Sequence, residues 1–268
     1  QERNNGMNIS KVNFSGINLT QNNKKTNGSS QVSTPVEPKI QLAKPSLENL
    51  QSLANISFGS QSMLEKLPLT PRAGGMTITH ALAENNDRIN SFFKGTLKDL
   101  IELRDHEEVA ESIKIQDDFK ETPVHIAARF ADKSKGLELL AENFPEAVEE
   151  TLTMQNERGL TPIQILILNK NTDAIDMLIE KFPDTVEKTL TIQDELGNTT
   201  VSSAIYFLPE SGLFEYFCEQ YPEATKKALT LQNKYGETPV HTARYRAENW
   251  NETTPLNTIK NKFPELLK

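Results

Sequence analysis

Cysteine and long apolar runs are nearly missing from this chain of 268 residues. Its single cysteine, Cys218, permits neither an intrachain disulfide nor a thiolate metal cluster, and such usage is typical of a reducing, intracellular compartment. No apolar run approaches the ~20 residues that span a bilayer, and the sequence does not open with the charged and then apolar segments of a signal peptide. We therefore expect a cytoplasmic protein that does not insert into a membrane.

Basic charge is scarce in residues 76 to 268. Residues 1 to 75 hold four acidic and eight basic side chains, a net charge of +4, so the total of -8 leaves 33 acidic and 21 basic side chains, a net charge of -12, for residues 76 to 268. A sequence-independent nucleic-acid binder needs a basic stripe to displace counterions from phosphates. An anionic membrane surface likewise attracts basic segments. The charge distribution argues against both kinds of partner.

Large apolar side chains are few in residues 1 to 75. Eight Asn precede Thr34, and no acid lies between Glu2 and Glu37. Such a composition cannot offset the entropy lost on ordering, so residues 1 to 34 are predicted to be a disordered tail. This Asn-rich tail also resembles the export signals of bacterial effectors, which gives a second hypothesis: secretion into a host cell. Residues 35 to 75 are predicted to be a linker with a short amphipathic helix around Leu47 to Leu53.

The feature that the chain does have is a repeat. The stretch ETPVHIAAR, from Glu121 to Arg129, has relatives whose threonines lie at Thr161, Thr199 and Thr238. Counted from Thr122, the intervals are 39, 38 and 39 residues, and a fixed period of this size predicts stacked repeats. Aligning the recurring pieces divides residues 76 to 268 into units at 76-114, 115-153, 154-191, 192-230 and 231-268.

Each unit is predicted to contain the same parts. A turn comes first, in which Asp or Asn precedes a glycine such as Gly159 or Gly197, with Lys120 in the glycine's place in the second unit. A helix follows, capped by Thr and with Pro at its first position. A second helix ends at an aromatic-proline pair such as Phe144-Pro145, and a short third helix completes the unit.

These parts resemble an ankyrin repeat array, whose usual unit has ~33 residues and a T-P-L-H-x-A signature. Thr122 to Ala127 and Thr238 to Ala243 keep the signature, whereas Gln164 stands for its His in the third unit, and Thr200 and Ser202 stand for its Pro and His in the fourth. The resemblance implies an all-α solenoid with short hairpin turns that binds a partner protein on a concave face. Units of this length also resemble those of effectors from intracellular bacteria.

The resemblance also implies which residues line that face, namely those at the hairpin tips and on the exposed side of the first helices. Aromatic and Arg side chains dominate interface energetics, and the candidates are mostly of these types. They are Phe119, Arg129, Phe130, Arg158, Leu160, Leu196, Tyr206, Phe207, Tyr235, Tyr245 and Arg246. Phe130 and Phe207 have a second interpretation, as core residues. We expect a monomer whose protein partner is basic or mixed in charge.

An enzyme would need a convergent set of reactive side chains. His125 and His241 are predicted to hold neighbouring turns in register, and Cys218 is predicted to be buried and inert. The spacing of these residues matches no metal site, so we predict no catalytic residue, cofactor, metal or small-molecule substrate. Two hypotheses stay open: a targeting domain of a larger enzyme whose catalytic part precedes Gln1, and an adaptor that residues 35 to 70 autoinhibit.

Overall fold

The computed structural model describes residues 69 to 71, 74 to 84, 96 to 131 and 135 to 267. The predicted tail, the linker helix and residues 85 to 95 of the first unit lie outside them. Within the described ranges the chain is helical, and the only β pairing is an isolated antiparallel bridge between Gln193 and Thr199. None of these helices is both long and apolar enough to cross a lipid bilayer. The all-α prediction is confirmed for this part of the chain.

The helices follow one another in groups of three. The first helices of the groups are α3 (Ile78–Glu84), α6 (Pro123–Arg129), α9 (Pro162–Leu168), α12 (Thr200–Phe207) and α15 (Pro239–Trp250). The second helices are α4 (Leu97–Leu103), α7 (Gly136–Asn143), α10 (Thr172–Lys181), α13 (Leu213–Gln220) and α16 (Thr254–Lys262). The third are α5 (His106–Ile113), α8 (Pro145–Thr151), α11 (Pro183–Thr189), α14 (Pro222–Thr230) and the 3-10 turn η2 (Pro264–Leu267).

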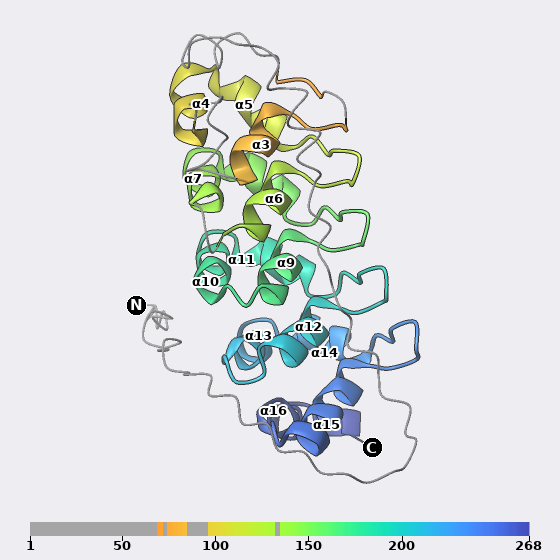
Figure 1. Ribbon diagram of the computed structural model, residues 1–268. Coiled ribbons are helices and arrows are strands. Elements are labelled where there is room, and N and C mark those ends of the chain that lie inside the picture. Colours follow the sequence, from red (N-terminus) through yellow and green to blue (C-terminus); the bar gives the residue numbers. More distant parts are fainter. Residues whose placement is uncertain (1–68, 72–73, 85–95, 132–134, 268) are drawn as a thin grey trace, which may run out of the picture.

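The groups stack into an elongated solenoid. Figure 1 shows the first helices one below another, with the hairpin turns projecting on one side and the second helices on the other. Each first helix contacts the next, from α3 through α6, α9 and α12 to α15. Each group thus packs mainly on its neighbours in sequence, which is the arrangement of a repeat protein. One group falls within each predicted unit, although the exact unit boundaries stay predictions.

The first helices begin at threonines because local hydrogen bonds fix their starts. The Thr122 side chain accepts a bond from the backbone N–H of His125, and the His125 side chain accepts one from the N–H of Thr122. Thr161 and Gln164 form the same reciprocal pair at the start of α9. These bonds satisfy donors that a helix start leaves unpaired, and a proline at the next position needs no donor partner.

The aromatic-proline pairs fasten the second and third helices to the core. Phe144, Phe182, Tyr221 and Phe263 are between 2% and 7% exposed and belong to one hydrophobic core that runs through all the groups. The proline that follows each ring ends one helix and occupies the first position of the next element. Cys218 of α13 lies in this core, as predicted.

The turns pack so closely that Gly159 leaves no room for a side chain. Gly159 has a φ of 72°, and a Cβ on it would lie 2.6 Å from the backbone nitrogen of Glu195 in the next hairpin. Lys120 occupies the equivalent position in the second unit with a φ of 56°, a left-handed conformation that costs a side-chain-bearing residue free energy.

Candidate functional site

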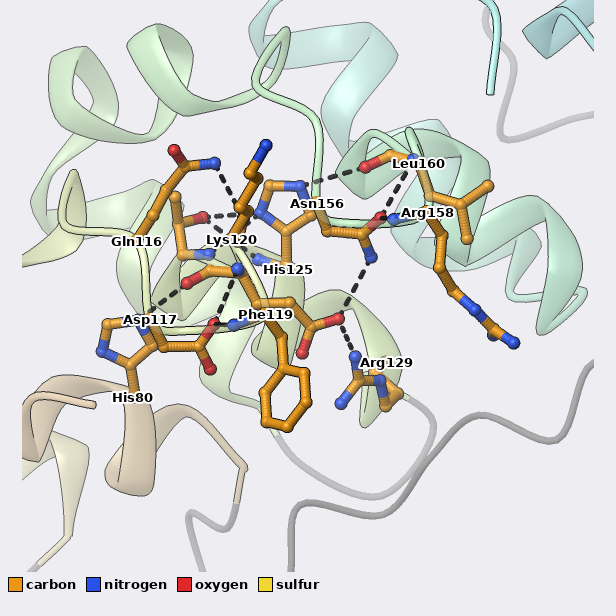
Figure 2. Close-up of polar contacts among 12 residues, drawn as sticks. His80, Gln116, Asp117, Phe119, Lys120, His125, Arg129, Asn156, Arg158 and Leu160 are labelled. Atoms are coloured by element: carbon orange, nitrogen blue, oxygen red, sulfur yellow. Dashed lines mark hydrogen bonds and ion pairs between the residues drawn. The ribbon is translucent and has the colours of Figure 1, made fainter. Parts of the chain in front are cut away.

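A hydrogen-bonded ladder joins successive hairpins (Figure 2). Asp117 Oδ1 accepts bonds from the backbone N–H groups of Phe119 at 2.9 Å and Glu121 at 2.8 Å, which shapes the turn. The next hairpin then donates the N–H of Glu157 to the Phe119 carbonyl at 2.8 Å. Equivalent bonds join the later hairpins. The Asp or Asn of each turn therefore belongs to the scaffold, and the tip side chains between these bonds stay available.

His125 bridges two units from inside the ladder. Its Nδ1 accepts the Thr122 N–H at 3.2 Å, so the proton resides on Nε2, which donates to the carbonyls of Met154 at 3.1 Å and Leu160 at 3.2 Å. Burial lowers the pKa of His125 to about 4 and that of the similarly placed His80 to about 3. Both rings are neutral at physiological pH. The predicted role of His125 in holding turns together is confirmed.

Gln164 and Ser202, which replace the signature His in the third and fourth units, form different hydrogen bonds. Gln164 Oε1 accepts the Thr161 N–H at 2.9 Å, and its Nε2 donates to the Ile192 carbonyl at 3.4 Å. An amide thus reproduces the acceptor and the donor of a neutral imidazole. Ser202 is too short for this bridge and donates to the Thr199 carbonyl at 2.8 Å within its own turn.

A buried ion pair occupies the face between the second hairpin and α6. Arg129 Nη2 contacts Glu121 Oε1, and Asn156 Nδ2 donates to the same oxygen at 3.1 Å. Burial raises the pKa of the neighbouring Asp117 to about 6, although the Arg129 charge opposes this. The side chain of Arg129 is only 10% exposed. Its main partner is the chain's own carboxylate, which limits what it can offer to another molecule.

The large apolar side chains that are exposed in the described ranges lie at hairpin tips or at the end of α15. Tyr235 is 73% exposed, Trp250 is 41% exposed and Phe119 is 39% exposed. Arg158 and Leu196, on the tips between them, are partly exposed. A ring in solvent adds little to the stability of the core.

An aromatic cluster lies where α12 meets α15. The Trp250 ring centroid is 5.8 Å from that of Tyr206 and 5.4 Å from that of Tyr245, with the rings edge to face. The Arg246 guanidinium carbon lies 4.2 Å from the Trp250 centroid and 5.2 Å from the Tyr206 centroid, and the same guanidinium pairs with Glu252. Aromatic and cation–π contacts thus hold these side chains in a fixed arrangement.

Solved structures of similar fold are known. The chain is similar to the structure described as the crystal structure of the ankyrin repeat domain of Bcl-3, a unique member of the IkappaB protein family, with a TM-score of 0.50 and 15% sequence identity over 74% of this chain and 75% of that one. The chain has an ankyrin-repeat fold. At this identity the likeness concerns the fold. No protein-family model matches the sequence, and the comparison with curated proteins found no match.

One of the predicted partner-binding residues is buried. Leu160 is 5% exposed and packs in the core, so the prediction that it is exposed at a hairpin tip is wrong. Arg246 is 9% exposed between aromatic rings and Glu252, so it supports the face from beneath. Phe130 and Phe207 are partly buried against the core, and each keeps some exposed surface.

Trp250 is an exposed aromatic residue that was not among the candidates predicted from the sequence. It lies at the end of α15, which has 12 residues where α6 and α9 have seven. The helix continues until Asn251 adopts a left-handed conformation with a φ of 58°. The sequence contains one signal of this longer helix. No Gly, Asn or Pro directly follows Arg246, whereas α9 is followed by Asn169 and Lys170.

His80, His125 and Cys218 lie in the interior of the array. Burial raises the pKa of the Cys218 thiol to about 12, which keeps it protonated and unreactive. Within the part of the chain that the structure describes, no group of three or more His, Cys, Asp or Glu side chains is arranged to hold a metal ion.

Proposed function

We propose that this chain is a protein-protein interaction module that binds a partner through the hairpin face, defined as the exposed side chains of the hairpin tips and of the first helices. The proposal is supported by the exposure of the large apolar side chains Tyr235 and Phe119 at hairpin tips and Trp250 at the end of α15. Repeated residues such as Thr122 and His125 maintain the scaffold, and the side chains that vary between units project from it.

The charge of the array favours a basic or mixed partner. Residues 76 to 268 carry a net charge of -12, which attracts a basic surface and repels an acidic one. Aromatic side chains supply contact area at low entropic cost, and truncating such a contact typically costs ~2 kcal/mol or more of binding free energy. The remaining candidates, Arg158 and Leu196 among them, are proposed as contacts that surround these anchors.

A capture experiment with a matched control tests the proposal. The full chain is immobilised beside a Tyr235→Ala, Tyr245→Ala double variant and a Glu180→Ala, Lys181→Ala control on the exposed side of α10. All three should melt within about 2 °C of one another, and only the hairpin-face variant should lose the protein that the full chain retains. Equal retention by both variants would exclude this face.

The proposal includes the absence of catalysis. It is supported by the commitment of His80, His125 and Cys218 to buried structural positions. We also propose that the protein is a cytoplasmic monomer, and that export into a host cell through residues 1 to 34 is a second possibility raised by their composition. Light scattering at working concentration tests the monomer. Fusion of residues 1 to 34 to a reporter tests export, which an untransferred reporter would exclude.

A further inference from the structure

The aromatic cluster at the junction of α12 and α15 has the properties of a binding site for a cation. We define the Trp250 site as Tyr206, Tyr245, Arg246, Trp250, Glu248 and Glu252. We propose that this site binds an Arg or Lys side chain in an extended basic segment of the partner protein. The proposal rests on the function proposed above and gives the partner's chemistry at one position of the hairpin face.

The geometry already shows that these rings accept a guanidinium. The Arg246 guanidinium carbon lies 4.2 Å from the Trp250 centroid and 5.2 Å from the Tyr206 centroid. Arg246 covers only part of Trp250, which is still 41% exposed. Tyr245 lies 5.4 Å from Trp250 on the same helix and is itself partly exposed. The open ring surface can therefore take a second cation.

Residues 244 to 252 carry two basic and two acidic side chains, Arg244 and Arg246 against Glu248 and Glu252. Glu252 pairs with Arg246, so these two charges offset each other. Glu248 is exposed, follows Tyr245 by three residues and so lies beside it on the surface of α15. In the described part of the chain Glu248 has no ion-pair partner. A cation on Trp250 and Tyr245 would meet this carboxylate.

The same arrangement disfavours other occupants. An apolar side chain over Tyr245 would remove water from the Glu248 carboxylate without replacing its hydrogen bonds, which is costly. An acidic segment would be repelled by Glu248 and by the net charge of -12 on residues 76 to 268. The ring contacts of Trp250 with Tyr206 and Tyr245 preorganise the site, so little side-chain entropy is lost on binding.

Trp250 makes the test specific because it is the single tryptophan of the protein. The full chain is titrated at low salt with the capped peptide Arg-Gly-Arg-Gly-Arg-Gly and with its Glu counterpart, and tryptophan emission is recorded. The Arg peptide should give a saturable change and the Glu peptide none. Tyr245→Leu should raise the half-saturation concentration about fivefold, as expected for an exposed cation–π contact. Glu248→Gln should raise it about threefold.

Glu146→Gln, an exposed carboxylate at the start of α8, is the matched control and should leave the titration unchanged. An equal loss with Glu146→Gln, or an equal response to the Glu peptide, would show non-specific attraction and overturn the proposal. A silent titration would overturn it as well. A response that appears only after the eight basic residues of positions 1 to 75 are replaced by Gln would make the chain's own segment the occupant and overturn the assignment to a partner.

The two proposals fail separately. Capture that depends on the hairpin face, together with a silent peptide titration, would end only the inference about the Trp250 site. A specific titration without face-dependent capture would end the proposed function while leaving a cation site on α15.

Discussion

The third and last units of the array start with related sequences and differ in how deeply the same positions are buried. In the third unit, Gln164 and Ile167 are fully buried beneath the fourth unit. At the same positions of the last unit, His241 and Arg244 are exposed, and Arg244 donates to the Leu267 carbonyl at 3.0 Å. A residue of the repeat is therefore inside or outside according to whether another unit packs on it.

The turn glycines show the same contrast. Gly159 and Gly236 have φ values of 72° and 78°. A Cβ on Gly159 would collide with Asp194 and Glu195, whereas a Cβ on Gly236 would meet nothing within 4 Å. Replacing either glycine should destabilise the protein through the positive φ of its own backbone. Replacing Gly159 should add a second destabilisation through contact with the neighbouring unit. Substitutions at matched positions separate the two effects.

The largest expected effect comes from placing the last unit's residue in the third unit. Ile167→Arg would bury an unpaired charge, so we expect a loss of more than ~4 kcal/mol in the free energy of unfolding, enough to prevent folding of the middle of the array. Arg244→Ile should change it by less than ~1 kcal/mol. Denaturation followed by circular dichroism measures both, and similar values for the two variants would contradict the difference in burial.

A cavity in the third unit should come next. Leu178 is fully buried in α10, so Leu178→Ala should cost ~2 to 5 kcal/mol and separate the unfolding of the two ends of the array. Exposed Glu180 on the same helix supplies the control, because Glu180→Ala should leave the midpoint almost unchanged. An unaltered single transition for Leu178→Ala would be evidence against the stacking shown in Figure 1.

The glycine pair separates backbone strain from packing. Both Gly159→Ala and Gly236→Ala place a side chain at positive φ, which costs ~1 to 2 kcal/mol. Gly159→Ala also forces the next hairpin to move and should cost ~1 to 3 kcal/mol more. The difference between the two unfolding free energies is the measurement, and a difference near zero would mean that the hairpins yield freely.

Acid should destabilise the array through its buried histidines. His125 has a pKa of about 4 when folded against 6.5 when unfolded, and His80 behaves alike with a pKa of about 3. The unfolded chain therefore binds protons first, and stability present above pH 6.5 is lost as the pH falls toward 4, by up to ~1.4 kcal/mol per pH unit for each ring. Asp117 and Asp176, whose pKa values are raised to about 6, oppose this loss below about pH 6.

The variant His125→Gln isolates the histidine contribution, since Gln164 shows that an amide can make the same bridge. Its stability should depend less steeply on pH between 6.5 and 4 than that of the parent chain. His241→Gln, at an exposed position, is the matched comparison for the substitution itself. Identical slopes for His125→Gln and the parent chain would show that His125 is not protonated on unfolding in this range.

The smallest expected effect is a gain in stability. Lys120 holds a φ of 56° at a position where the other turns have glycine, so Lys120→Gly should stabilise the protein by ~0.5 to 1 kcal/mol after the entropy of the unfolded chain is considered. Thermal unfolding would detect it, with Lys234→Gly on another tip as a control for the loss of charge. A lower melting temperature for Lys120→Gly would indicate that the lysine side chain stabilises the turn.

Much of the fold could be predicted because its signals are local. Thr122, Pro123 and His125 specify a helix start within four residues, and Phe144-Pro145 specifies a helix end within two. The site could be predicted only in part. Tyr235 and Phe119 project from turns whose shape is local, so their exposure followed from the repeat. Leu160 was predicted among the exposed tip side chains and is instead buried in the core.

The aromatic cluster illustrates the same limit at a longer range. Tyr206 and Trp250 are 44 positions apart in the printed sequence and meet only because α15 extends to Trp250 and packs on α12. Arg246 changes from a predicted contact into the support of that cluster for the same reason.

The sequence by itself determined the period, the helix starts and stops and the residues that form each turn, because caps, prolines and turn bonds act among neighbours in the chain. The tertiary structure decided which varying side chains are exposed, which are covered by the following unit and which rings assemble around Arg246. Burial and side-chain contacts depend on what the next repeat places nearby, and a single unit's residues do not contain that information.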